Sequence, residues 1–269
     1  MRLASIAMYV APPPVLEATR SLWTFVQAYL QRAGLPDAPL QLDQSVAHDA
    51  AWLRPDLLLA QTCGYPYVTR LRGRVRLVAT PIYDLPGCDG PLMRSFIIVH
   101  QASAWGSLKD LRGSRAAINS PDSNSGSNLF RAEIAPFAEN GRFFSEVIET
   151  GGHGASMDAV SNGQADVAAI DCVTYGLIKR FDPQRVSNLR ILAQTKPGPG
   201  LPFVTAAATT DRELGLLREA LLAAIAEPSL ASARDTLSLS DFVQLADADY
   251  EPLLDFERQA ATRGYPRIA

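Results

Sequence analysis

The sequence is poor in the residues that mark nucleic-acid-binding, disulfide-rich and metal-binding proteins. Of its 269 residues, only three are lysines, three are cysteines and three are histidines. The 25 Lys and Arg residues nearly balance the 28 Asp and Glu residues, and no run of like charge occurs. Because nucleic-acid-binding proteins usually carry a basic stripe, the sequence predicts no nucleic-acid partner.

The few cysteines and histidines are widely separated. Cys63, Cys88 and Cys172 form no C-x-x-C, and an odd number argues against a disulfide framework and against structural zinc. A Cys63–Cys88 bridge stays open, but we predict three free thiols. The histidines form neither H-x-x-x-H nor H-E-x-x-H, so we predict no metal site and no cofactor.

Long apolar runs are also missing. No stretch reaches the about 18 apolar residues needed to span a bilayer, so no membrane span is predicted. The apolar segment Met1–Val10 contains only Arg2 as a charge, which is compatible with a signal peptide. Three prolines follow almost at once without a convincing small-x-small cleavage site. We therefore interpret residues 2–9 as a core strand, and a cytoplasmic location stays open.

The remaining composition is that of a globular α/β protein. Hydrophobic residues make up 47% and charged residues 20% of the chain, and the length allows one large domain or two modest lobes. The run Leu57–Ala60 is typical of a strand covered on both faces. Strands and helices alternate, which predicts sheets with helices on both sides. The expected strands are 2–8, 40–46, 56–62, 75–80, 95–100, 115–119, 146–150, 166–170, 189–194 and 203–208; the expected helices are 14–32, 126–137, 155–161, 173–180 and most of the chain after 208.

Two turn-rich segments, near residues 100–106 and 195–202, divide this pattern. They predict a discontinuous lobe 1 (1–101 and 198–269) and an inserted lobe 2 (102–197), each a mostly parallel sheet flanked by helices. Two lobes joined by two hinge crossings can close around a ligand. The expected architecture therefore favours a binding protein with a cleft between the lobes.

One polar segment, Asn119–Asn128, follows a predicted strand and opens a predicted helix. The first turn of a helix presents backbone N–H groups and the positive end of the helix dipole, so it can bind an anion without a cationic side chain. Ser123, Asn124 and Ser125 add polar side chains, and Gly126 permits close approach. The alternative is simple N-capping, for which one residue would suffice. We favour anion binding; no P-loop motif is present, which argues against an NTPase.

Two further polar residues follow neighbouring strands. His153 lies in the turn after strand 146–150, and Asp171 lies at the end of the next strand; both turns belong to the edge where ligands collect. A carboxylate there can accept a hydrogen bond from a P–OH group but repels an unprotonated anion such as sulfate. The alternatives are an incidental surface histidine and, for Asp171, a helix cap.

Tyrosines at the ends of the first lobe's strands complete the candidate set. Tyr9 follows the first strand and Tyr65 follows strand 56–62, so their hydroxyl groups could close over a ligand. Packing is the alternative for both, and for nearby Tyr67 we prefer it.

Catalysis has weaker support. A Ser-His-Asp triad would have to combine Ser125, His153 and Asp171, and no G-x-S-x-G motif is present. We therefore predict that the protein is not an enzyme.

These segments together resemble the substrate-binding proteins of phosphate/phosphite/phosphonate ABC transporters, within the type 2 periplasmic-binding-protein fold. Asn119–Gly126 is similar to the family's Ser-Thr-Ser-Gly anion loop, His153 stands in its Thr-Gly-x-His-x-x-Ser context, and Gly163–Asp171 also fits. The resemblance implies that the serine loop and the histidine hold an oxyanion and that first-lobe tyrosines complete the pocket. It also implies a periplasmic location and an ABC permease as partner.

Two departures from the family pattern narrow the expected ligand. Asn124 stands where the family has Thr, and Pro197–Pro202 supplies no second carboxylate for a ligand amine, so we expect no aminoalkyl ligand. We predict a monomeric solute-binding protein that captures phosphate, phosphite or a phosphonate for uptake. The alternative functions are a cytoplasmic enzyme and a ligand sensor on the same fold.

Overall fold

The computed structural model describes residues 2–269, which divide into two compact units. The first unit contains residues 2–84, Asp89–Pro91 and Gly200–Asp249. The second contains Leu85–Cys88, Leu92–Pro199 and Tyr250–Ala269. Within the described residues, no helix is both long enough and apolar enough to cross a membrane.

The first unit is built on a five-stranded mixed sheet with the order β1-β2-β12-β3-β13. Strand β1 runs parallel to β2, whereas β12 is antiparallel to both β2 and β3, and β13 is antiparallel to β3. Every residue of β2 is buried, as the continuous apolar run predicts. The bounds are β1 Leu3–Ser5, β2 Leu57–Gln61, β12 Phe203–Ala206, β3 Val75–Tyr83 and β13 Leu239–Val243.

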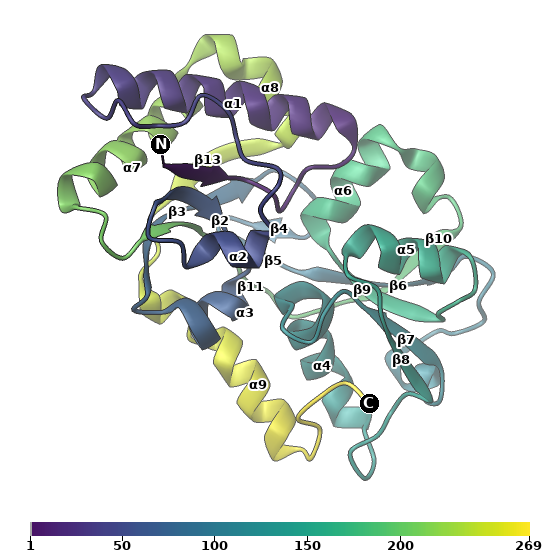
Figure 1. Cartoon of the computed structure of the whole chain (residues 1–269). Coiled ribbons are helices and arrows are strands. Elements are labelled where there is room, and N and C mark those ends of the chain that lie inside the picture. Colours follow the sequence, from purple (N-terminus) through teal and green to yellow (C-terminus); the bar gives the residue numbers. More distant parts are fainter. Residues whose placement is uncertain (1) are drawn as a thin grey trace. The chain divides into compact units, whose positions relative to one another are not determined.

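Helices cover this first sheet. The long helix α1 (Pro13–Arg32) packs beside α7 (Asp211–Ala226) and α8 (Ala231–Leu237), and α1 and α8 are seen side by side in Figure 1. The apolar residues of α1 recur at helical spacing and so lie on one face, and that face is buried. Short helices α2 (His48–Trp52) and α3 (Gly64–Pro66) flank β2 in sequence.

The second unit has its own five-stranded sheet, with the order β10-β6-β9-β7-β8. Strands β10, β9, β7 and β8 run in one direction, and β6 runs against them. Its longer helices are α4, α5, α6 and α9, and α4 packs beside α9 (Figure 1). The bounds are β6 Ser95–His100, β7 Arg115–Ile118, β8 Glu146–Glu149, β9 Val167–Asp171, β10 Leu189–Gln194, α4 Leu129–Ile134, α5 His153–Ser161, α6 Cys172–Phe181 and α9 Pro252–Thr262.

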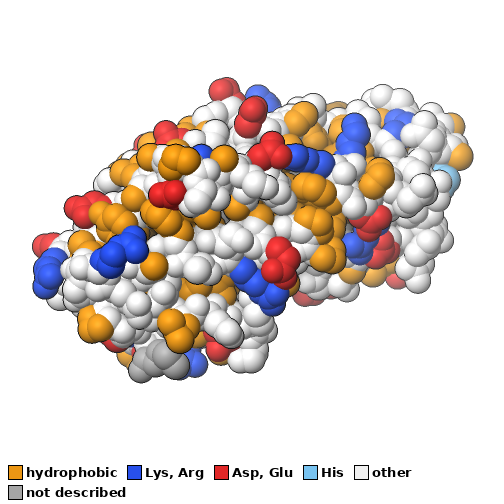
Figure 2. Space-filling view, turned by 90° about the horizontal axis from the view of Figure 1, so that it is seen from above, with side chains coloured by type: hydrophobic (Ala, Val, Ile, Leu, Met, Phe, Trp, Pro, Cys, Tyr) orange, Lys and Arg blue, Asp and Glu red, His pale blue; other side chains and the backbone are white. Residues whose placement is uncertain are grey.

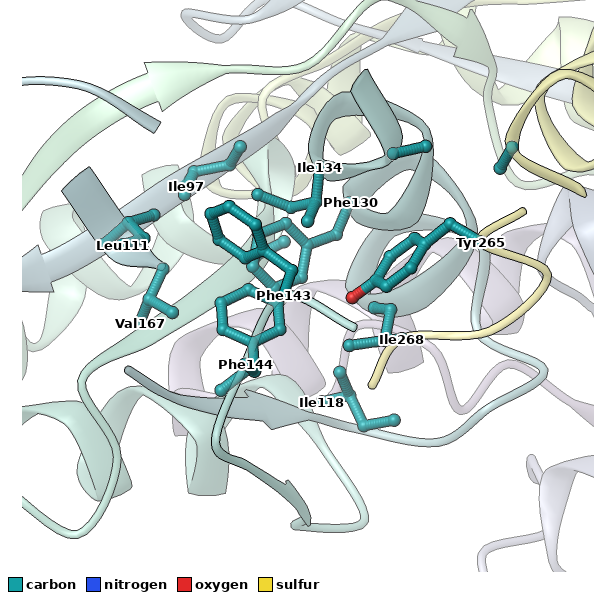
Figure 3. Close-up of a cluster of buried hydrophobic side chains, with 14 of the residues drawn as sticks. Ile97, Leu111, Ile118, Phe130, Ile134, Phe143, Phe144, Val167, Tyr265 and Ile268 are labelled. Atoms are coloured by element: carbon teal, nitrogen blue, oxygen red, sulfur yellow. The ribbon is translucent and has the colours of Figure 1, made fainter. Parts of the chain in front are cut away.

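An aromatic cluster forms the core of the second unit beneath α4. Phe130, Phe143 and Phe144 pack together with Tyr265 and Ile268 of the C-terminal segment (Figure 3). The backbone N–H groups of Phe143 and Phe144 donate to the carbonyl oxygen of the last residue at 2.7 and 3.0 Å. Buried apolar contacts and backbone hydrogen bonds therefore hold the C-terminal segment in this unit.

The α/β class with flanking helices is confirmed, but the division of the chain differs from the predicted boundaries. Strand β6 belongs to the second unit, where it pairs with β10 and β9, and so does the segment Tyr250–Ala269. The predicted boundaries placed both in the first lobe. Local turn signals mark where the chain bends, whereas long-range pairing decides which sheet a strand joins.

In the first unit one predicted strand is absent, and one strand forms where none was predicted. Residues 40–46, all within the described part, form no strand; the Asp43 carboxylate accepts from the N–H groups of Ser45 and Val46 at 2.8 Å each and so forms a local turn. Conversely, residues expected to be helical or a helix break form β13. Its partner β3 lies far away in the sequence, so no local pattern reveals the pairing.

Charged side chains of both signs are interspersed on the face shown in Figure 2. Many arginines are paired within the chain, as in Arg115–Asp166 at 2.8 Å and Arg185–Asp158 at 2.6 Å. Arg76 pairs with Asp211 at 2.6 Å. Pairing of this kind is typical of a solvated surface.

Candidate functional site

The predicted polar turns leave the second sheet at the same edge. Because β7, β8 and β9 run in one direction, the segments that follow them begin side by side. The backbone confirms this, since the N–H of Gly151 donates to the carbonyl of Asn119 at 2.9 Å and joins the turns after β7 and β8. The antiparallel strand β6 starts at this edge, where Ser95 is the register partner of Asp171.

The serine turn after β7 is a buried helix start. Residues Asn124–Asn128 form a turn of π-helix that continues into α4, and all five are buried. Ser123 is the N-cap: its Oγ accepts from the N–H of Gly126 at 3.1 Å, and its carbonyl accepts from the N–H of Asn128 at 2.9 Å. The cap uses Ser123 Oγ as an acceptor, so its hydroxyl hydrogen can still be donated to an anion. Capping and anion binding are therefore compatible at this residue.

Gly126 is required by the packing of this turn. A Cβ at this position would lie 1.7 Å from Oδ1 of Asn119 and 2.7 Å from its Cγ. No side chain larger than hydrogen fits without moving Asn119. The sequence predicts close approach of a ligand to Gly126, and that stays a prediction; the close neighbour in the structure is Asn119.

Ser125 and His153 are brought together from separate turns. Oγ of Ser125 lies 2.8 Å from Nε2 of His153, the first residue of α5. The carbonyl of Ser125 accepts from the buried hydroxyl of Ser95 at 2.8 Å, which fixes the turn against the start of β6. Tertiary structure thus confirms that Ser125 and His153 are neighbours, although they are 28 residues apart.

The imidazole of His153 is neutral at physiological pH. Burial lowers its pKa from 6.5 to about 4, and the carbonyl of Ala169 offsets this only in part. Among residues 2–269, Nδ1 of His153 is buried without a partner in hydrogen-bond geometry. The neighbouring carbonyl oxygen of Ala169 attracts a proton on Nδ1 and would repel a lone pair there. The neutral ring is therefore assigned its proton on Nδ1, and Nε2 accepts from the Ser125 hydroxyl.

Asp171 caps helix α6. Its Oδ1 accepts from the N–H of Thr174 at 2.9 Å, and the residue is 2% exposed. The capping interpretation is confirmed, while a contact between Asp171 and a ligand stays a prediction. The two roles do not exclude each other, because a carboxylate has acceptor capacity beyond one hydrogen bond.

A hydrogen-bond chain behind the serine turn was not predicted. Arg131 in α4 donates to Oδ1 of Asn128 at 2.7 Å, and Nδ2 of Asn128 donates to Oδ1 of Asn124 at 3.3 Å. Since a guanidinium can only donate, Asn128 must turn its oxygen toward Arg131 and its NH₂ group toward Asn124. The NH₂ group of Asn124 then remains as a donor. The sequence does contain a signal for this chain, because positions 124, 128 and 131 are polar and share one helix face.

The predicted tyrosines belong to the first unit. Tyr9 is 7% exposed and packs edge-to-face on Tyr83 with ring centroids 5.6 Å apart, and Tyr65 is 8% exposed. Both follow neighbouring parallel strands, and their contact with a ligand stays a prediction. Tyr67 is buried and its hydroxyl bonds to Asp247, which agrees with the packing interpretation.

Comparison with known proteins identifies related sequences and folds. A family model described as the periplasmic substrate-binding protein of a phosphonate ABC transporter matches residues 21–250. No curated protein matches the chain. A binding protein component of an ABC phosphonate transporter from Pseudomonas aeruginosa has a TM-score of 0.76 at 18% identity, over 98% of this chain and 88% of that one. PhnD1 from Prochlorococcus marinus, in complex with methylphosphonate, has a TM-score of 0.77 at 17% identity, over 97% and 98% of the two chains.

Proposed function

Because the chain belongs to the family of periplasmic substrate-binding proteins of phosphonate ABC transporters, we propose that it captures phosphate, phosphite or a phosphonate for delivery to an ABC permease. The structural neighbours are binding proteins as well, and the family consists of solute-binding proteins rather than enzymes. The observation that carries the proposal is the buried serine turn, in which Ser125 lies 2.8 Å from His153.

Several donors of this turn suit a tetrahedral oxyanion. The hydroxyl group of Ser123, the NH₂ group of Asn124 and the backbone N–H groups of the helix start can donate to its oxygens. The hydroxyl group of Ser125 joins them when it turns from Nε2 of His153 to the ligand. Hydrogen bonds to a charged group contribute roughly 1.5–3 kcal/mol each. Four to six such bonds, less the costs of ordering and desolvation, could reach the about 8 kcal/mol of a micromolar site.

The electrostatics favour a ligand that still carries a proton. Residues 120–128 contain no Lys or Arg, and the guanidinium of Arg131 is bonded to Asn128. When the Ser125 hydroxyl turns to the ligand, Nε2 of the neutral His153 becomes an acceptor, and the carboxylate of Asp171 offers another. A P–OH group can donate to either one, whereas sulfate has no proton to donate at neutral pH. Phosphorus oxyanions therefore fit this set of groups better than sulfate does.

Titration calorimetry of the full chain tests the proposal. We expect micromolar binding of at least one of phosphate, phosphite and methylphosphonate, and no measurable heat with sulfate. Ser125→Ala should weaken binding about tenfold or more, since it removes a hydrogen bond to a charged ligand. The exposed Ser187 provides a control, and Ser187→Ala should bind like the parent. Absence of heat with every phosphorus ligand would refute the proposal.

Separate measurements test the finer parts of the proposal. Tyr9→Phe and Tyr65→Phe each remove one hydroxyl group, so either variant should lose affinity if that tyrosine contacts the ligand. Size-exclusion chromatography with light scattering tests the monomeric state. Detergent-solubilised permease from the same genome tests the delivery step, because it should bind the ligand-loaded protein in preference to the ligand-free form.

A further inference from the structure

Two cysteines far apart in the sequence meet next to the candidate site. Sγ of Cys88 lies 3.6 Å from Sγ of Cys172, although the residues are 84 positions apart. Both belong to the second unit, whereas Cys63, the partner considered for Cys88 on sequence grounds, belongs to the first. Cys172 is fully buried and directly follows Asp171, while Cys88 is partly exposed.

The backbones that carry the two thiols are held against each other. The N–H of Cys172 donates to the carbonyl of Arg94 at 3.1 Å, and the N–H of Arg94 donates to the carbonyl of Gly87 at 3.1 Å. Gly87 itself packs so closely that a Cβ there would lie 2.7 Å from Cβ of Cys172. The sulfur pair therefore rests on a hydrogen-bonded scaffold at the start of β6.

We propose that Cys88 and Cys172 form a thiol pair that closes to a disulfide when the protein meets a disulfide oxidant. A disulfide bond is about 2.05 Å long, so the two sulfur atoms need to approach by about 1.5 Å. Rotation of the partly exposed Cys88 side chain can supply part of this movement. The family is periplasmic, and the bacterial periplasm is a compartment in which disulfides form and persist.

The reaction balances as two thiol–disulfide exchanges. The Cys88 thiolate attacks one sulfur of a small disulfide such as oxidised glutathione, which forms a mixed disulfide and releases one glutathione thiolate. Cys172 then gives up its proton and attacks Sγ of Cys88, which releases the second glutathione. The protein loses two electrons and two protons, and oxidised glutathione gains both to become two glutathione thiols.

Exposure sets the order of these two steps. Cys88 can be reached from solvent, whereas Cys172 is enclosed. The hydrogen bond to Cys88, burial and the adjacent Asp171 carboxylate all raise the pKa of the Cys172 thiol. Cys172 therefore acts as the second, resolving thiol. The bridge would tie Cys88 to the start of α6. Cys88 is the last residue before the chain returns to the first unit at Asp89.

The experiment is oxidation of the full-length reduced protein with oxidised glutathione at pH 8, followed by thiol titration and non-reducing peptide mapping. We expect the three thiols of the chain to fall to one, a loss of about 2 Da, and a cross-linked peptide that contains Cys88 and Cys172. We also expect Tm to rise by about 5–15 °C, and dithiothreitol to reverse the rise.

Single substitutions separate this pair from other outcomes. Cys63→Ser should retain both the cross-link and the Tm rise, whereas Cys88→Ser should lose both. Cys172→Ala gives a second test, and the peptide map of the parent protein does not depend on whether that variant folds. Three remaining thiols, a bridge that includes Cys63, or a disulfide between two chains would overturn the proposal.

Discussion

The side-chain amide of Asn128 donates to Oδ1 of Asn124 over 3.3 Å, and this bond determines which end of the Asn124 amide is left to donate. Arg131 imposes the orientation of Asn128, so a cation in α4 acts on the serine turn through the side chain of Asn128. Asn124 stands where the resembled family has a threonine hydroxyl. The hydrogen-bond chain explains how an amide can take the place of that donor.

The first prediction tests this orientation at Asn124. Asn124→Asp keeps the size and the oxygen that faces Asn128, but it replaces the donating NH₂ group with a negatively charged oxygen. Repulsion of an anionic ligand should lower its affinity by about 30-fold or more. Asn124→Thr restores a donor and should stay within about threefold of the parent. Calorimetry measures both, and equal affinities of the Asp and Thr variants would contradict the proposed role.

The second prediction concerns the space at Gly126. Gly126→Ala places a methyl group 1.7 Å from the present position of Asn119 Oδ1, so the turn must shift. We expect a loss of about 1–3 kcal/mol in the free energy of unfolding, measured with urea, together with weaker ligand binding. A Cβ added at Gly215 in α7 would have nothing within 4 Å, so Gly215→Ala is the control and should gain about 0.5–1 kcal/mol. Destabilisation of both variants alike would argue against a packing requirement specific to Gly126.

The third prediction follows from the lowered pKa of His153. The folded protein holds this imidazole neutral down to about pH 4, whereas the unfolded chain binds the proton near pH 6.5. The unfolded state therefore binds more protons between these values, and stability falls as the pH is lowered through this window. The full loss is about 3 kcal/mol.

Urea unfolding between pH 7.5 and 4 measures this loss. His153→Gln, which lacks a titrating ring, serves as the reference, because other groups titrate alike in both proteins. The difference between parent and variant should be constant above pH 6.5 and should shift in favour of the variant below it. A difference that does not change with pH would show that the pKa of His153 is not lowered in the folded state.

The fourth prediction isolates the charge of Asp171 from its capping role. Asn is also a good N-cap and keeps an oxygen for the N–H of Thr174, so Asp171→Asn should preserve α6. The substitution removes the charge that would repel sulfate. We expect competition calorimetry to show that the preference for a phosphorus ligand over sulfate falls about tenfold or more. If the variant rejects sulfate as strongly as the parent, Asp171 is only a cap.

Local patterns predicted most elements of the second unit. The strand 189–194 and the helices near 153–161 and 172–181 appear within two residues of their expected bounds. Their signals are short-range, because apolar periodicity and capping residues act within a few positions. The wrong strand at 40–46 shows the limit, since a side-chain turn at Asp43 competes with strand pairing there.

Long-range contacts decided what local patterns could not. Strand β13 exists because β3 offers it an open edge, and the last 20 residues join the second unit because their carbonyl and aromatic groups meet Phe143 and Phe144. Likewise, no sequence spacing indicates that Cys172, rather than Cys63, lies beside Cys88. Contacts between residues far apart in the sequence form only when the whole chain packs, so short-range patterns do not indicate them.

The amino-acid sequence by itself determined that a serine-rich helix start and a histidine turn would follow strands of one sheet. Residue chemistry and hydrophobic period are local properties, so they can be seen without a structure. Only the tertiary structure decided that Ser125 meets a neutral His153, that Asn124 is oriented through Asn128, and that Asp171 caps α6. Those features depend on burial and on hydrogen bonds between distant residues, which exist only once the strands have paired.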